Sequence, residues 1–468
     1  MTRPPGSTPA PPLAGGPHGP QALRPLLDTV LDALRTGTDA RPGPLPAGGP
    51  TTVARTVHDA LEPLGGLLPD HGTGPHEALR TLVHALAAGS ADPAHPHCAG
   101  HLHGPPLALA VAADLAASAL NPSLDSWDQA PAATEIETTL TRLLAHHFHP
   151  HAPHPDALLT TGGTEANHLA LLLAREHHGP HLTVITGANA HHSIPRAAWQ
   201  LGLTPPHTLP TPTGVIDPHT LHNALTHTTG PTLVTATAGT TDTGQIDPLH
   251  PIADLCRHHG ADLHIDAAYG GTLTFSPTHR HLLDGLHHAH TLTVDLHKLG
   301  WQPVAAGLLT TPDHTRLTPL THRADYLNPP DDTEAGLPDL LGRSLRTTRR
   351  PDALKIATTL RALGRDGLAH LIDTTLDLTH HLAHLIHHSP HLELHSPPTL
   401  TTLLFRPHHT TDTQLAQLRR TLLHQGHAVL GRAHADGRLW LKATLLNPHT
   451  THGDLTALVT LLEGNSPR

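Results

Sequence analysis

Three short stretches of the sequence carry side chains that can do chemistry, and the first of them is TTGGTEAN at 160–167. Two glycines there are followed by Thr164 and Glu165, where a strand pattern gives way to a helical one. Successive backbone N–H groups at a helix N-terminus bind anions, and the phosphate of a cofactor is a natural guest. A tight turn before a capped helix explains the same residues equally well, so this stretch alone decides nothing.

The other two stretches end apolar runs typical of buried strands, DLHIDAAYGG at 262–271 and TLTVDLHK at 291–298. Asp266 in the first is costly to bury unless it meets a cation such as a protonated pyridine nitrogen. An aspartate that caps the following turn is the simpler alternative. Lys298 in the second can lose its charge at low dielectric and attack an aldehyde. An anion nest, a buried acid and a buried lysine, in this order on one sheet, fit pyridoxal 5'-phosphate.

The elements that must position these residues are indicated by alternating apolar patterns. Strand-like runs at 182–186, 232–239, 262–271 and 291–298 alternate with helical ones such as 248–260, which predicts a parallel sheet with helical crossovers. We expect three regions. Residues 1–95 form a Pro-rich, disordered start and a helical arm, residues 96–335 a large cofactor-binding domain, and residues 336–468 a small α+β domain. Helices are expected in the arm at 21–35, 53–61 and 76–88, and in the last region at 352–371, 373–388, 412–426 and 453–463.

Composition excludes several classes of function. The 468 residues carry a formal net charge of −11 with only 28 Lys and Arg, so no basic face for nucleic acid is expected. Two cysteines far apart exclude a disulfide framework and fit a reducing, cytoplasmic setting. The N-terminus lacks the apolar core of a signal peptide, and no apolar run is long enough to span a membrane.

The 51 histidines raise the alternative of a metal-storing or metal-sensing protein. They are spread along the whole chain, and the densest group, at 146–154, lies beside prolines in an expected loop. Metal sites need ligands that converge on one point, so we predict surface histidines and no metal site.

Seven motifs together resemble the group II pyridoxal-phosphate-dependent amino-acid decarboxylases, which have fold type I. The motifs are TTGGTEAN, HSIPRA, TAGTTDTGQIDP, HIDAAYGG, VDLHKLGWQP, ADYLNP and LGRSLRTTRRPDALK, and the resemblance runs from about residue 95 to the C-terminus. SLDSWDQAPAATEIE and TTRRPDALK are most similar to the bacterial 2,4-diaminobutyrate decarboxylase-like branch. The resemblance implies an α/β fold with a mainly parallel seven-stranded sheet, helices on both faces, a helical N-terminal arm and a small α+β C-terminal domain.

The resemblance also implies how the matching residues hold the cofactor. Lys298 forms the Schiff base, Asp266 pairs with the ring nitrogen, and His191 stacks on the ring, although its neighbour His192 fits the motif nearly as well. The remaining contacts are implied for Gly163, Thr164 and His297 at the phosphate, Thr241 near the ring substituents, and Ala268 on the ring face opposite His191.

The reaction implied is loss of CO2 from an L-amino acid, after which Tyr326 on a mobile loop returns a proton to the substrate. His101 and His103 in AGHLHGPP, with Trp127 and Asp128, are expected to face the substrate, and Arg349 lies at the rim. We hypothesise a polar pocket in which Asp128 recognises a second amine; a helix-start role explains Asp128 equally well.

Relatives on this scaffold also act as decarboxylating oxidative deaminases or β-eliminating C–S lyases in natural-product pathways, and both alternatives stay open. The family's shared active sites imply a homodimer.

Overall fold

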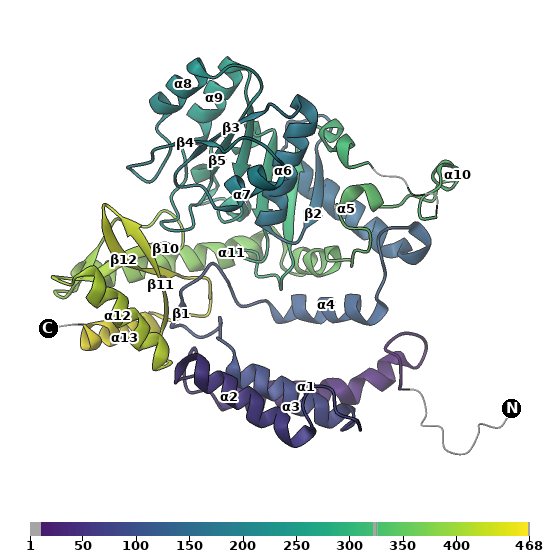
Figure 1. The fold of residues 1–468 in the computed structure, drawn as a ribbon, viewed down its shortest axis with the longest axis vertical. Coiled ribbons are helices and arrows are strands. Elements are labelled where there is room, and N and C mark those ends of the chain that lie inside the picture. Colours follow the sequence, from purple (N-terminus) through teal and green to yellow (C-terminus); the bar gives the residue numbers. More distant parts are fainter. Residues whose placement is uncertain (1–10, 322–323, 325, 467–468) are drawn as a thin grey trace.

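The computed structural model describes residues 11–321, 324 and 326–466. Figure 1 shows a large α/β body, a smaller β-sheet region packed at its side, and a helical arm that extends beneath both. The N-terminal residues 1–10, for which disorder is expected, lie outside the described residues. Within those described, no helix is both long and apolar enough to cross a membrane.

The arm consists of three helices, as the apolar patterns predict. They are α1 (Gly19–Asp39), α2 (Gly49–Leu61) and α3 (Pro75–Gly89). Pro75 begins α3 without loss of a hydrogen bond, because the first N–H groups of a helix have no partner within it. Each helix is longer than predicted, since polar residues beyond the apolar stripe continue it.

The large domain is built on a seven-stranded sheet in the order β2-β8-β7-β6-β5-β3-β4. All of its strands run parallel except β8, which is antiparallel to both neighbours. This confirms the predicted fold class. The strands are β2 (Asp156–Thr160), β3 (Thr183–Gly187), β4 (His207–Leu209), β5 (Thr232–Thr237), β6 (Asp262–Asp266), β7 (Thr291–Asp295) and β8 (Gly307–Thr311).

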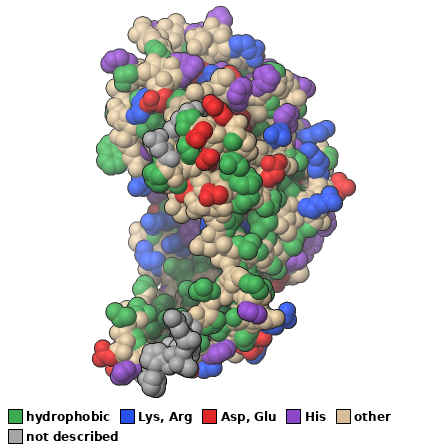
Figure 2. All heavy atoms as spheres, turned by 90° about the vertical axis from the view of Figure 1, so that its right-hand side faces the viewer, with side chains coloured by type: hydrophobic (Ala, Val, Ile, Leu, Met, Phe, Trp, Pro, Cys, Tyr) green, Lys and Arg blue, Asp and Glu red, His purple; other side chains and the backbone are tan. Residues whose placement is uncertain are grey.

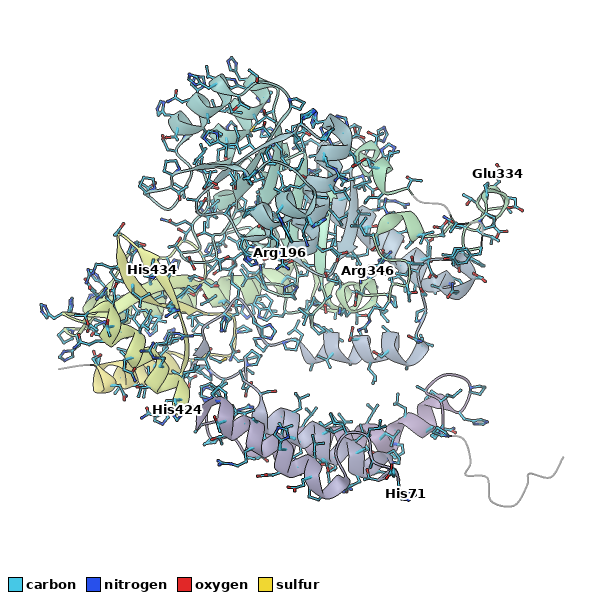
Figure 3. All side chains as sticks on the ribbon, viewed as in Figure 1. His71, Arg196, Glu334, Arg346, His424 and His434 are labelled. Atoms are coloured by element: carbon cyan, nitrogen blue, oxygen red, sulfur yellow. The ribbon has the colours of Figure 1, made fainter. Side chains whose placement is uncertain are left out.

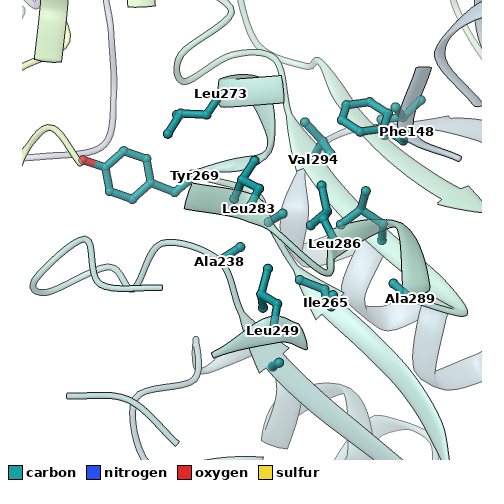
Figure 4. Close-up of a cluster of buried hydrophobic side chains, with 14 of the residues drawn as sticks. Phe148, Ala238, Leu249, Ile265, Tyr269, Leu273, Leu283, Leu286, Ala289 and Val294 are labelled. Carbon is teal, nitrogen blue, oxygen red and sulfur yellow. The ribbon is translucent and has the colours of Figure 1, made fainter. Parts of the chain in front are cut away.

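Helices cover both faces of this sheet because its strands are apolar on both sides. Adjacent residues of β3 show the division: Val184 packs under α6 and α7, whereas Ile185 joins the larger core on the opposite face. Figure 4 shows part of that larger core, to which Ile265 of β6, Val294 of β7 and Phe148 of α5 all belong. The helices of this domain are α4 (Ala108–Leu120), α5 (Pro131–Phe148), α6 (Gly163–His178), α7 (Ser193–Gln200), α8 (Pro218–His227), α9 (Leu249–His259) and α10 (Pro330–Glu334).

The C-terminal region forms a second sheet in the order β1-β11-β12-β10-β9. Its first strand comes from far away in the chain: β1 (Cys98–Ala99) pairs in parallel with β11, with Cys98 opposite Val429. The residues directly after the arm therefore belong to this sheet, and not to the large one. The other elements are β9 (Leu392–Leu394), β10 (Thr402–Pro407), β11 (Val429–Ala435), β12 (Arg438–Thr444), α11 (Ala353–His388), α12 (Asp412–His424) and α13 (His452–Asn465).

The predicted division of the long C-terminal helical stretch into two helices at residue 372 is wrong. Ile372 is fully buried inside α11, which runs unbroken from there to His388. The irregular point lies earlier, at Gly364, whose φ of 63° is a conformation that glycine adopts without strain. Short 3-10 helices complete the fold at Glu62–Leu64, Trp127–Gln129, Gly271–Phe275, Arg280–Leu283, Leu286–His288, His314–Leu320 and Leu341–Arg343.

A buried ion pair ties α5 to the segment that precedes α11. The Arg349 Nη1 atom lies 2.6 Å from Glu137 Oε1, and both side chains are almost completely buried. Burying two charges is repaid only while both partners are present, so each depends on the other.

Replacing Arg349 with Met should therefore destabilise the protein by about 3–5 kcal/mol, because it leaves the Glu137 carboxylate buried and alone. The double variant Arg349→Met, Glu137→Leu should regain much of that loss. The neighbouring pair Arg350–Asp114 is more exposed, so Arg350→Met serves as a control with a small effect. Urea unfolding measures all three; an unchanged midpoint for Arg349→Met would contradict a structural role for the pair.

Candidate active site

The chemically active side chains gather at the carboxyl edge of the large sheet. β2, β3, β5, β6 and β7 all run in the same direction, so the loops that follow them meet at one edge. Ligand sites of open α/β sheets form at this edge. A cavity of about 350 Å³ lies there. All eight residues expected to contact the cofactor line it: Gly163, Thr164, His191, Thr241, Asp266, Ala268, His297 and Lys298.

One wall of the cavity is the turn from β2 into α6. Gly162 has a φ of 155°, and a Cβ built on it would lie 2.9 Å from the His297 ring, so only glycine fits. Glu165 folds back to accept hydrogen bonds from the backbone N–H and the hydroxyl of Thr161, at 2.6 and 2.7 Å. These contacts fix the N-terminus of α6 with its free N–H groups toward the cavity, an arrangement that binds anions.

Asp266 forms the end of β6 and is almost completely buried. One carboxylate oxygen accepts from Asn167 Nδ2 at 2.7 Å, and the other accepts from the backbone N–H of Ala268 at 3.1 Å. Each oxygen keeps a lone pair for a further donor. The carboxylate is therefore held as an acceptor for a cationic group in the cavity.

Lys298 follows β7 by three residues, and its Nζ atom lies 3.0 Å from Asp295 Oδ2. Asp295 is a buried cavity residue that the sequence analysis missed, although its position three residues before Lys298 at a strand end was a usable signal. His297 lies between them in the chain. Burial lowers the pKa of His297, and the Asp295 carboxylate partly opposes this, so the ring is mainly neutral at pH 7.

The side chains that line the cavity fit the chemistry of pyridoxal 5'-phosphate. The Nδ1 atom of His297 is buried without a hydrogen-bond partner among the described residues, and it lies beside the N-terminus of α6. An unsatisfied ring nitrogen next to free N–H groups is a ready partner for a phosphate. Asp266 for a ring nitrogen and Lys298 for an aldehyde lie on the same cavity.

His191, and not His192, lines the cavity. Its Nδ1 atom lies 2.8 Å from the hydroxyl oxygen of Ser193, and burial lowers its pKa. His192 instead lines a wider cleft of about 990 Å³ that continues from the same site toward the C-terminal region. The geometry thus favours His191 for the stacking role.

The residues expected to face the substrate are not gathered in the cavity of the single chain. His101 and His103 are exposed, while Leu102 between them lines the cavity. Trp127 and Asp128 lie in an exposed turn, where Asp128 accepts a hydrogen bond from the Ser126 hydroxyl at 2.6 Å.

Arg349 does not lie at the rim as expected. Its guanidinium group is buried against Glu137, because a buried carboxylate needs a cationic partner.

The two tyrosines of the chain lie in opposite environments. Tyr326 is 82% exposed and does not line the cavity. The segment after it projects from the body of the molecule, as the position of Glu334 in Figure 3 shows. Tyr269, which the sequence analysis did not single out, is a buried cavity residue whose hydroxyl bonds to Thr401 and Thr402. Burial raises the pKa of Tyr269 to about 12, so its proton is firmly held.

No group of three or more His, Cys, Asp or Glu side chains suited to a metal ion is found among the described residues.

Comparison with known proteins also indicates an enzyme that uses pyridoxal 5'-phosphate. Residues 77–408 match the model of the pyridoxal-dependent decarboxylase conserved domain. The L-2,4-diaminobutyrate decarboxylase of Rhizobium meliloti (strain 1021) is 39% identical over 451 residues, covering 92% of this chain and 88% of the relative. The enzyme of the same name from Acinetobacter baumannii is 30% identical, covering 81% and 82%.

A solved structure gives the same result for the fold. It is the glutamate decarboxylase domain of diaminobutyrate-pyruvate transaminase and L-2,4-diaminobutyrate decarboxylase from Vibrio parahaemolyticus. It matches with a TM-score of 0.84 and 28% identity, covering 97% of each chain. The chain belongs to the pyridoxal-dependent decarboxylase family and is an amino-acid decarboxylase with pyridoxal 5'-phosphate as its cofactor.

Proposed function

We propose that this enzyme converts L-2,4-diaminobutyrate, or a similar amino acid with a second amine, into the corresponding amine and CO2. The observation that carries the proposal is the match of nearly the whole chain to an L-2,4-diaminobutyrate decarboxylase. The charges of the cavity agree with it. Besides Asp266, which is assigned to the cofactor, Glu165 and Asp295 line the cavity, whereas no arginine among the described residues does. Such a site suits a substrate with an extra ammonium better than one with an extra carboxylate.

We assign each step of cofactor binding to a residue that lines the cavity. When bound, the cofactor supplies an electron sink for the negative charge left on the substrate's Cα after CO2 departs. Lys298 is the nucleophile that bonds to its aldehyde carbon. Asp266 holds the ring nitrogen protonated, and His191 covers one ring face. The N-terminus of α6 and His297 hold the phosphate.

Tyr326 is proposed as the acid that returns a proton to Cα. The chain has two tyrosines, and Tyr269 keeps its proton in hydrogen bonds that join the two domains. Tyr326 is exposed on a segment outside the cavity, so it must be brought to a site by closure or by assembly.

We also propose that the enzyme is a homodimer. Large apolar side chains are exposed on α1 and α3 and on α4, where the arm and the body face each other. Figure 2 shows hydrophobic side chains gathered in this hollow. The exposed residues are Leu31, Leu34, Leu82, Leu86, Leu109, Val111, Leu115 and Leu120. Patches of this kind are rarely left in water, and a second copy of the chain would cover them.

The substrate is tested by measuring CO2 from a panel of L-amino acids while dissolved oxygen is followed in the same vessel. We expect release from 2,4-diaminobutyrate without oxygen uptake, and little release from aspartate or glutamate. Release coupled to oxygen uptake would instead identify an oxidative deaminase. Absence of release, with pyruvate or ammonia formed from a cysteine conjugate, would identify a C–S lyase.

The acid is tested with Tyr326→Phe, which keeps the ring and removes the transferable proton. Amine formation should fall by about 100-fold or more, which is what a positioned acid contributes. Cofactor absorbance should stay unchanged, because Tyr326 lies outside the cavity. Amine formation at the normal rate would exclude Tyr326 as the acid.

Shared sites are tested by refolding an equal mixture of two inactive variants, Lys298→Ala and Tyr326→Phe. If the tyrosine serves the partner's site, each hybrid dimer regains one intact site, and activity returns to about a quarter of wild type. If the tyrosine serves its own site, both sites of the hybrid stay defective. A lack of recovery despite hybrid dimers seen by mass spectrometry would contradict sharing.

A further inference from the structure

A single amide side chain, Asn167, is part of the cavity lining and bonds directly to Asp266 and, through Ser193, to His191. It lies one turn into α6 and is almost completely buried. Its Nδ2 atom donates to Asp266 Oδ2 at 2.7 Å and to Ser193 Oγ at 2.9 Å. Its Oδ1 atom lies 3.0 Å from Nε2 of His264, a residue with no exposed surface.

The direction of each hydrogen bond in this network follows from Asp266. A carboxylate only accepts, so the amide nitrogen of Asn167 must face Asp266. The amide oxygen then faces His264, and because that oxygen only accepts, His264 Nε2 must carry a proton. The other ring nitrogen, Nδ1, lies 3.0 Å from the hydroxyl of Thr291, which can donate to it. His264 thus fixes which way Asn167 points.

The second branch of the network reaches His191. The Ser193 oxygen accepts from Asn167, which leaves the Ser193 proton for Nδ1 of His191, 2.8 Å away. The backbone N–H of Ser193 also points to this Nδ1 atom, at 3.3 Å. Two donors on one nitrogen fix the rotation of the His191 ring and leave its proton on Nε2.

We propose that Asn167 and His264 are positioning residues that set both cofactor-facing groups through one hydrogen-bond network. Asn167 holds Asp266 as a pure acceptor for the ring nitrogen and, through Ser193, holds the His191 ring in place. His264 keeps Asn167 from turning over, which would put its oxygen against the Asp266 carboxylate. Burial keeps the pKa of His264 below its ordinary value, so the ring stays neutral. The inference rests on the roles proposed for Asp266 and His191.

The test compares two ligands on the enzyme stripped of cofactor: pyridoxal 5'-phosphate and its 1-deaza analogue, in which carbon replaces the ring nitrogen. Both offer the same aldehyde and phosphate, so the dissociation constant of the analogue divided by that of pyridoxal 5'-phosphate, called the ligand ratio below, reports the contact with Asp266. Asn167→Ala should raise the dissociation constant of the natural cofactor by about 10-fold or more and that of the analogue by less than about 3-fold. Equilibrium dialysis gives both constants without any turnover.

Two substitutions of His264 test whether its N–H donor is what matters. His264→Gln keeps an N–H that can donate to Asn167 and should leave the ligand ratio near wild type. His264→Leu is similar in bulk, has no donor, and should lower the ratio as Asn167→Ala does. His149 is an equally buried histidine bonded to Thr310 outside the site, so His149→Leu serves as the control for simple loss of packing.

The proposal would be overturned if Asn167→Ala and His264→Leu raised both dissociation constants by the same factor. A merely structural role would affect the two ligands equally, because they differ only at the ring nitrogen. Asp266→Asn separates this failure from failure of the proposed function. If Asp266→Asn also leaves the ratio unchanged, the assigned role of Asp266 is wrong. If Asp266→Asn lowers the ratio and the variants of Asn167 and His264 do not, Asp266 binds the ring nitrogen without help from these two residues.

Discussion

A carboxylate buried at the end of a strand is the constraint on which the rest of the site depends. Asp266 is nearly inaccessible to water, and an unpaired charge there would cost more than the stability of a domain. Donors from a helix and from the backbone of the next turn compensate it. The protonated ring nitrogen proposed as its partner would complete the compensation. The hydrogen bonds that make burial of Asp266 tolerable for the fold are thus the same ones that position it for the cofactor.

The two domains meet directly beside the loops that carry the site residues. Tyr269 lies three residues after Asp266, and its hydroxyl bonds to Thr401 and Thr402 of the C-terminal region. Leu400 packs into the core of the large domain beside it. Trp301, three residues after Lys298, donates its indole N–H to the carbonyl of Leu446 at 2.7 Å. Both loops that carry the reacting groups are therefore held from behind by the second domain, which limits their motion.

The sequence predicted those parts of the site that are encoded locally, and it missed those that arise from distant contacts. Gly163, Asp266 and Lys298 each stand where a strand ends, and an apolar run followed by a polar residue is visible in a linear pattern. Asn167 lay inside a predicted motif, but its role needs the side chain of His264, 97 residues away. Likewise, nothing near Cys98 indicates that it pairs with Val429. Arg349 was assigned to the rim because it matches an arginine found there in the family that the sequence resembles, whereas burial beside Glu137 decides its position.

The histidines show that the function of a side chain depends on its surroundings more than on how often the residue occurs. Rings come together in pairs on the surface, such as His381 with His452 and His222 with His259. Among the described residues no third ligand joins any pair to make a metal site. The histidines with a defined chemical state are those held by a partner of fixed polarity, as His264 is held by the oxygen of Asn167. An imidazole acquires a role from what it faces, and 51 of them in one chain do not alter that requirement.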